Sequence, residues 1–243
     1  MCYIIVTVWG EEVIEFNNVS KIYKKEFTAV KNINLKIDNG EFVFIVGKSG
    51  AGKSTLIKLL LREINPSEGI VTYNNQDITK IRKRKVAEYR RKIGFVFQDY
   101  RLLPKMTVYE NIAFAMEMIC CNSKNIRREV PLVLSMVGLS DKAKHYPDEL
   151  SGGEQQRVAI ARAVINKPET IIADEPTGNL DPETSKEIMR ILTEVNKRGT
   201  TVIMATHDKE IVNYYQRRVI ELKSGVIIRD IKAGGYVNEP KKD

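Results

Sequence analysis

The sequence from residue 42 to residue 55 reads Phe42-Val43-Phe44-Ile45-Val46-Gly47-Lys48-Ser49-Gly50-Ala51-Gly52-Lys53-Ser54-Thr55. Its first five residues form a continuous apolar run, which predicts a strand covered on both faces. The residues from Lys53 to Glu63 predict a helix, and the stretch between strand and helix fits the pattern G-x-x-x-x-G-K-[ST]. The alternative is a Gly/Ser-rich turn that fits by chance. The flanking strand and helix favour a phosphate-binding loop instead.

The chemistry of this loop suits a polyphosphate. Glycines let the backbone wrap around an anion so that successive N–H groups point inward, and the positive end of the following helix adds to their field. Lys53 supplies a full charge near the β- and γ-phosphates, and the Ser54 hydroxyl is a Mg²⁺ ligand. The residues predicted to contact the nucleotide here are Gly47, Lys48, Ser49, Gly50, Ala51, Gly52, Lys53, Ser54 and Thr55.

Two consecutive carboxylates, Asp174 and Glu175, follow a second apolar strand predicted at Thr170–Ala173. Ligands gather at the carboxyl edge of a parallel sheet, and successive strand residues point in different directions. We therefore expect Asp174 to join Ser54 in holding Mg²⁺ and Glu175 to polarise the water that attacks the γ-phosphate. A helix-capping acid before Pro176 is the alternative, but it does not explain the pair. The two motifs together predict a nucleotide-hydrolysing site.

Composition bounds the class of protein. The chain has 243 residues, of which 43% are hydrophobic, and a net charge of +8. This length suits one large domain, and the positive balance suits nucleic acid, an anionic membrane surface or a nucleotide. No apolar run approaches the ~18 residues of a membrane span, and the first residues lack a signal peptide, so we expect a cytoplasmic protein. Three cysteines predict no zinc site. A strained vicinal disulfide between Cys120 and Cys121 is the alternative to two buried thiols, which we expect.

Short apolar runs alternate with helical patterns, which predicts an α/β fold with a mostly parallel sheet. Expected strands are Val13–Phe16, Ile33–Ile37, Phe42–Val46, Gly69–Tyr73, Ile93–Phe97, Thr170–Ala173, Thr201–Ala205, Val219–Leu222 and Val226–Ile231. Expected helices are Lys53–Glu63, Thr107–Met118, Asn125–Val137, Gly152–Ile165, Pro182–Lys197 and Lys209–Tyr215.

Residues 99–164 break this alternation, because they read as nearly all helix with Pro104, Pro131 and Pro147 as breaks. We interpret the chain as a single domain, 1–243. Its core lobe is formed by 13–98 and 165–231, its inserted helical lobe by 99–164 and its loose tail by 232–243.

The segment Leu150-Ser151-Gly152-Gly153-Glu154-Gln155-Gln156-Arg157 resembles the signature segment of the ATP-binding cassette (ABC) ATPases. Taken alone, the same letters describe a Ser N-cap with Glu154 in a capping box about equally well. The other motifs match the family in order, and the resemblance extends from about Val13 to Ile231. It implies a P-loop NTPase (RecA-like) core with a mostly parallel sheet, an N-terminal antiparallel β subdomain and an inserted helical subdomain.

The resemblance also assigns roles to residues. It implies that Tyr23 stacks on adenine, that Gln98 contacts Mg²⁺ and the γ-phosphate, that Asp181 lies in the segment called the D-loop, and that His207 contacts the γ-phosphate. Catalysis is then expected from Glu175, His207, Lys53 and Gln98, with Mg²⁺ held by Ser54, Gln98 and Asp174. Two chains are expected to pair head to tail when ATP binds, so that Ser151, Gly152 and Gly153 act on the partner's ATP.

The stretches 96–104 and 107–115 resemble those of the bacterial cell-division ATPases, and those of lipoprotein-release and macrolide- or peptide-export ATPases less closely. The narrower resemblance implies an integral membrane partner that relays the ATP cycle to cell-wall hydrolases, with the chain peripheral on the inner face of the membrane. A groove near Gln98–Pro104 and Thr107–Asn111 is expected to receive that partner. Leu102, Leu103 and Met106 there are either groove residues or ordinary core.

A basic run at residues 80–85 and 90–92 is the main feature that favours nucleic acid. A solvated helix face is the plainer interpretation, and attraction to anionic lipid is a third. We expect no nucleic-acid partner, because residues 99–164 carry no long coiled coil of the DNA-repair type. A nucleotide-gated scaffold with slow turnover is a further class; the intact Glu175 and His207 favour catalytic competence but do not indicate its speed. The apolar lead at residues 1–10 departs from the family and has no assigned purpose.

Overall fold

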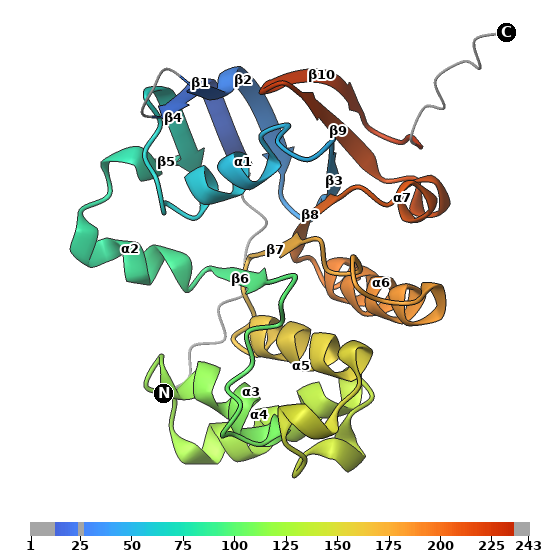
Figure 1. Ribbon diagram of the computed structural model, residues 1–243. Coiled ribbons are helices and arrows are strands. Elements are labelled where there is room, and N and C mark those ends of the chain that lie inside the picture. The colour runs from blue at the N-terminus through green and yellow to red at the C-terminus, as the bar shows by residue number, and fades with distance from the viewer. Residues whose placement is uncertain (1–12, 24–26, 236–243) are drawn as a thin grey trace, which may run out of the picture.

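The computed structural model describes residues 13–23 and 27–235, arranged as two sheets and a group of helices (Figure 1). The smaller sheet is antiparallel and has the strand order β2-β1-β4-β5. Its strands are β1 (Val13–Tyr23), β2 (Phe27–Asp38), β4 (Glu68–Tyr73) and β5 (Gln76–Asp77). The antiparallel β subdomain implied by the family resemblance is thereby confirmed.

The larger sheet has the order β10-β9-β3-β8-β7-β6, and all its strands are parallel except the edge strand β10. Its strands are β3 (Phe42–Val46), β6 (Ile93–Val96), β7 (Thr170–Asp174), β8 (Thr201–Thr206), β9 (Arg218–Lys223) and β10 (Val226–Ile231). Every residue of β3 and β8 is buried. The strand order and directions confirm the predicted α/β class and mostly parallel sheet. The prediction succeeded because unbroken apolar runs are typical of strands covered on both faces.

The helices are α1 (Lys53–Leu60), α2 (Lys83–Arg90), α3 (Val108–Glu117), α4 (Ser123–Met136), α5 (Gly152–Val164), α6 (Pro182–Lys197) and α7 (Lys209–Tyr215). Three of them, α3, α4 and α5, pack together on one side of the larger sheet (Figure 1). Within the residues that the structure describes, no helix has the length and apolar character that crossing a bilayer demands.

Strand β3 contributes to two apolar clusters on opposite faces of the larger sheet. Phe44 packs with the helical group and α6, whereas Val43 and Ile45 pack with α1 and the smaller sheet. This division follows from the two-residue period of a strand. On the helical side, Gly94 of β6 permits a close approach of α5, because a Cβ at this position would lie 2.5 Å from the Ala163 carbonyl oxygen.

Several elements differ from their predicted form. Strands β1 and β2 are longer than expected, because irregularities in their register interrupt the apolar alternation. Helix α2 was not predicted, since it is almost entirely polar. Helix α4, by contrast, runs through Pro131 as the expected helix Asn125–Val137 did. The buried stripe Ile126, Val130 and Leu134 keeps the helix in place on both sides of the proline.

The expectation of buried thiols is wrong for Cys120, which is exposed. Cys121 is half-buried, and both thiols are free. Cys120 lies in a turn after α3 with a φ of 58°. The apolar lead 1–10 and residues 236–243 of the predicted tail lie outside the described residues.

Candidate functional site

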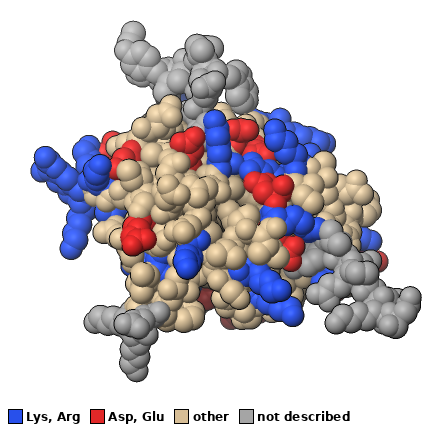
Figure 2. Space-filling view, turned by 90° about the horizontal axis from the view of Figure 1, so that it is seen from above, with Lys and Arg blue, Asp and Glu red and all other residues tan. Residues whose placement is uncertain are grey.

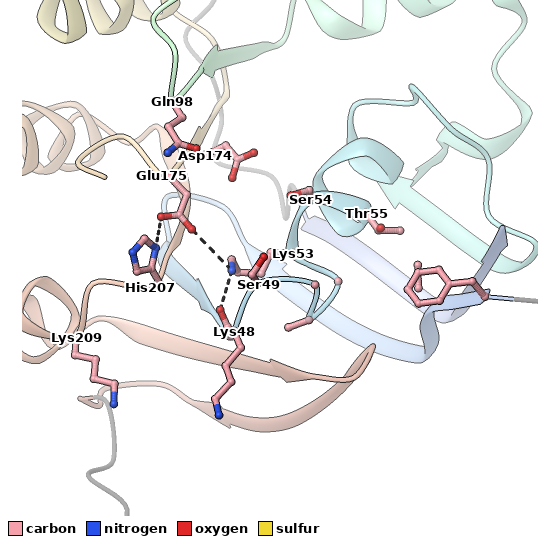
Figure 3. Close-up of a pocket in the computed structure, with 16 residues that line it drawn as sticks. Lys48, Ser49, Lys53, Ser54, Thr55, Gln98, Asp174, Glu175, His207 and Lys209 are labelled. Atoms are coloured by element: carbon pink, nitrogen blue, oxygen red, sulfur yellow. Dashed lines mark hydrogen bonds and ion pairs between the residues drawn. The ribbon is translucent and has the colours of Figure 1, made fainter. Parts of the chain in front are cut away.

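Residues that follow four parallel strands meet in one cleft of about 680 Å³. Gly47 follows β3, Gln98 follows β6, Asp174 ends β7, and His207 follows β8. The volume falls within the roughly 300–1,000 Å³ typical of ligand pockets. Figure 3 shows the lining, which comprises every residue from 47 to 55 together with Phe27, Ala29, Gln98, Asp174, Glu175, His207 and Lys209.

The glycine loop needs its glycines for both conformation and space. Gly47 has a φ of 151°, and a Cβ there would lie 2.4 Å from the Leu222 carbonyl oxygen. Gly52 is the N-cap of α1 with a φ of 111°, and a Cβ there would lie 2.9 Å from the Ala29 carbonyl oxygen. No side chain caps α1, and its first turn holds no acid. The N–H groups at this helix end therefore remain available to an anion in the cleft.

Lys53, Glu175 and His207 point toward one another in the cleft (Figure 3). The Lys53 ammonium donates a hydrogen bond of 2.7 Å to the Gly47 carbonyl oxygen and lies 3.8 Å from Glu175 Oε1. Glu175 Oε2 contacts His207 Nδ1. The side chains of Lys53 and Glu175 are 10% and 16% exposed, whereas that of His207 is 67% exposed. Two nearly buried side chains of opposite charge type thus face each other beside an exposed imidazole.

The two carboxylates after β7 diverge because of a backbone turn between them. The Glu175 N–H still donates to the Ala205 carbonyl of β8 at 2.9 Å, but Glu175 itself has a φ of 51°. A left-handed conformation is unusual for a residue of this kind and is found at functional sites. It turns the Glu175 side chain toward Lys53 and leaves Asp174 on the side of Ser54 and Gln98 (Figure 3).

Asp174, Ser54 and Gln98 offer the cleft a carboxylate, a hydroxyl and an amide oxygen. These are hard donors of the kind that Mg²⁺ prefers, and Mg²⁺ is typically held by one or two carboxylates together with substrate phosphates. Burial, and after it the neighbouring Glu175 carboxylate, raises the pKa of Asp174. A divalent cation would offset both effects, so the residues present fit this ion. Among the described residues no cluster of three His, Cys, Asp or Glu side chains offers an alternative metal site.

Five of the predicted binding residues do not line this cleft: Tyr23, Ser151, Gly152, Gly153 and Asp181. Ser151 forms the capping box of α5, in which its N–H donates to Glu154 Oε2 at 2.8 Å. Asp181 caps α6 by accepting from two backbone N–H groups at 3.0 Å each. A Cβ on Gly153 would lie 2.3 Å from Thr184 of α6, so the starts of α5 and α6 are in contact.

Phe27 and Lys209 line the cleft but were not predicted. Phe27 stands opposite Tyr23 in the β1–β2 ladder and is 61% exposed. Because the expected strands stopped short of both residues, the sequence pattern gave no sign that Phe27 faces the loop. Lys209 begins α7 two residues after His207. Its positive charge so close in sequence to a predicted phosphate contact was the signal that could have found it.

Comparisons with known proteins agree with this geometry. The model of the ABC transporter family matches residues 30–178. The "Cell division ATP-binding protein FtsE" of Bacillus subtilis is 52% identical over 223 residues, which cover 92% of this chain and 98% of that protein. FtsE of Mycobacterium tuberculosis is 54% identical over 224 residues, covering 92% and 97%. The chain belongs to the ABC transporter family, in its FtsE branch.

The fold of an ABC cassette is confirmed by solved structures. The cassette MJ0796, described as a dimer in a post-hydrolysis state bound to ADP and Pi, superposes with a TM-score of 0.83 at 38% identity. The match covers 92% of this chain and all of that one. In cassette terms, the cleft joins the glycine loop, Gln98, the Asp174–Glu175 pair and His207, whereas the signature segment and Asp181 lie outside it.

Proposed function

We propose that this chain is the ATP-hydrolysing subunit of a cell-division complex attached to a membrane protein of the FtsX type. The observation that carries the proposal is the convergence of Lys53, Glu175 and His207 on a glycine loop whose helix has a free N-terminus. Membership of the FtsE branch supports the cellular role. The substrate is ATP, and the products are ADP and phosphate.

Binding of the triphosphate rests on the loop and on Lys53. The inward N–H groups and the N-terminus of α1 supply donors on several sides of the phosphates. Lys53 now pairs with the Gly47 carbonyl and with Glu175. A γ-phosphate would become its new partner, which leaves the nearly buried Glu175 side chain free to accept a proton.

Hydrolysis then needs a base beside the γ-phosphate. Glu175 takes a proton from a water as the water oxygen bonds to the γ-phosphorus, and the bond to the bridging oxygen of ADP breaks. His207 contacts the same carboxylate, so it holds Glu175 in position and lies within reach of the phosphate. Mg²⁺ held by Ser54, Asp174 and Gln98 would offset charge on the β- and γ-oxygens.

The residues outside the cleft support a two-chain site. Ser151 is exposed, and the signature segment follows a 3₁₀ turn at the surface of the helical group. We propose that Ser151, Gly152 and Gly153 of one chain cover the ATP held by the glycine loop of a second chain, with Asp181 at the seam. The dimeric state of the solved cassette MJ0796 supports this arrangement.

A second hollow, the α2–α3 groove, supports attachment to a membrane partner. It measures about 600 Å³ and lies between α2, β6, α5 and the end of α3. Its apolar lining includes Phe97, Leu103 and Met118, and among its described lining residues there are four arginines and no carboxylate. We propose that the groove binds one segment of the membrane partner, and that this segment has an apolar face together with acidic side chains that pair with the arginines.

The groove expected near Gln98–Pro104 and Thr107–Asn111 coincides with the α2–α3 groove only in part, because no residue from 107 to 111 lines the latter. The three apolar residues expected there separate in the structure. Leu103 lines the α2–α3 groove, whereas Leu102 packs against the core and Met106 lines a different hollow on the helical group. The interpretation that all three receive the partner is therefore not supported by their positions. A variant at Leu102 would disturb packing as well as binding.

Co-purification with FtsX tests the groove. Met118 is 57% exposed at the end of α3, and Leu132, 61% exposed on α4, is a matched control that does not line the groove. Met118→Asp should lose the complex while keeping Mg²⁺-dependent ATP hydrolysis, and Leu132→Asp should keep both. An unchanged complex in the Met118 variant would dismiss the groove, and absence of ATP hydrolysis from the wild-type chain would dismiss the enzymatic proposal.

A further inference from the structure

Helix α2 carries an unusual density of positive charge. Residues 80–92 hold eight Lys or Arg and a single acid, Glu88. Figure 2 shows Lys and Arg side chains projecting at the edge of the molecule where Figure 1 places α2. The helix packs through Tyr89, which is buried and donates to the Leu60 carbonyl at 2.5 Å. The charged residues are thus displayed on a fixed helix.

Some of these charges have local partners. Lys80 pairs with Asp77 at 3.1 Å, Lys85 with Glu88 at 2.6 Å, and Lys92 with Glu169 at 3.4 Å. The Arg90 guanidinium donates to the Leu61 and Arg62 carbonyls. These contacts give partners to four of the eight cations, and those of Arg90 hold the C-terminal end of α2 against the end of α1.

Four cations of the run have no such partner among the described residues: Arg91, which lines the α2–α3 groove, and Arg82, Lys83 and Arg84. Arg82, Lys83 and Arg84 are exposed, and the structure gives none of them an ion pair or side-chain hydrogen bond within residues 13–23 and 27–235. They stand at the N-terminus of α2, where no side chain caps the helix and the first turn holds no acid. The helix dipole disfavours cations at that end, and a stable helix would carry Ser, Asp or Glu there. These three cations therefore destabilise the start of α2, which indicates that they serve an interaction with something outside the helix.

We propose that Arg82, Lys83 and Arg84 form a basic shoulder that binds the phosphate headgroups of an anionic lipid bilayer. The shoulder is continuous with the α2–α3 groove, because Ala87, Arg90 and Arg91 of the same short segment line that groove. If the groove receives a membrane protein, as the proposed function holds, the shoulder faces the same bilayer. Three unpaired cations at a membrane surface match the charge of anionic headgroups.

The composition of the shoulder favours lipid over nucleic acid. Single-stranded nucleic acid is held by stacking on exposed aromatic rings, and the aromatic residue of α2, Tyr89, is buried. Sequence reading in duplex DNA uses Asn, Gln or Arg carried by an element that enters the major groove. Helix α2 spans eight residues and lies against the body of the protein. It therefore does not project as a groove-entering helix does, and its charges suit the flat surface of a bilayer.

Vesicle flotation of the full chain tests the shoulder. Vesicles contain phosphatidylcholine alone or equal parts phosphatidylcholine and phosphatidylglycerol. The test variant changes Arg82, Lys83 and Arg84 to Gln. The control removes the same charge from α6 by changing Lys186, Arg190 and Lys197 to Gln. A juxtamembrane cation contributes about a fivefold factor in partitioning, so the test variant should bind anionic vesicles about a hundredfold more weakly. The control should lose far less.

Three results would overturn the proposal. They are wild-type binding that does not distinguish the two vesicles, equal losses in the test and control variants, or charge-dependent binding to duplex DNA without binding to anionic vesicles. Added salt should weaken wild-type binding, because exposed charges are screened. ATP hydrolysis in solution, measured on the same samples, should stay unchanged in the test variant. Failure of the shoulder is thereby distinguished from failure of the ATPase proposal.

Discussion

Replacing Glu175 by Gln removes one negative charge and one proton acceptor from the cleft while preserving the shape of the side chain. Glu175 lies 3.8 Å from the Lys53 ammonium and contacts His207. If Glu175 is the base, its loss should lower the rate of hydrolysis by roughly 10²–10⁴-fold, which is the usual contribution of a positioned base.

The same substitution should tighten ATP binding. Two unit charges about 4 Å apart interact by about 1 kcal/mol in water and about 4 kcal/mol at the effective dielectric of a protein surface. Glu175 competes with the γ-phosphate for Lys53 and repels the phosphate itself. Taking the lower of these values, the variant should bind ATP roughly five- to tenfold more tightly than the wild type.

The assay measures steady-state phosphate release, ATP affinity and the oligomeric state in the presence of ATP and Mg²⁺. The variant should bind ATP, hydrolyse it very slowly and accumulate as an ATP-bound dimer. Glu194→Gln, at an exposed position on α6, is the control and should behave as the wild type. A Glu175→Gln protein with a turnover within about tenfold of the wild type would refute the role of Glu175 as the base.

The remaining predictions concern adenine contact, packing and pH. Phe27→Ala should weaken ATP binding more than Tyr23→Ala, because Phe27 lines the cleft and Tyr23 does not; the reverse order in a titration would restore the expected role of Tyr23. Gly94→Ala should lower the free energy of unfolding in urea by about 2 kcal/mol, since its Cβ would lie 2.5 Å from the Ala163 oxygen; a loss below about 0.5 kcal/mol would mean that α5 can shift freely. Arg218→Ala should cost about 3 kcal/mol in the same measurement, because this nearly buried side chain donates to Asp230 at 2.8 and 2.7 Å and also pairs with Glu41; a neutral result would contradict that reasoning. The raised pKa of Asp174 means that the folded state holds its proton more tightly than the unfolded chain does. The free energy of unfolding should therefore fall as the pH rises above 3.8, the ordinary pKa of an Asp. If the same fall with pH persists in Asp174→Asn, another group causes it.

Local patterns predicted much of the fold. Strands β3 and β10 and helices α6 and α7 match their expected bounds, because each carries an unbroken apolar run or a clear periodic pattern between strong end signals. Elements whose order depends on distant partners were harder to predict. Helix α2 has almost no apolar face, and the long hairpin of β1 and β2 carries register shifts that interrupt its alternation.

The candidate site also has features that the sequence predicted and features that it did not. The sequence alone determined that a glycine loop follows a buried strand and that two carboxylates end another, because a parallel sheet necessarily brings such strand ends to one edge. Only the tertiary structure decided which neighbours share the cleft. In the structure, Phe27 and Lys209 line the cleft and Ser151 does not. Leu102 packs against the core, whereas its neighbour Leu103 lines the α2–α3 groove. Such choices depend on the relative placement of elements far apart in the chain, and a pattern with a period of two or 3.6 residues carries no information about that placement.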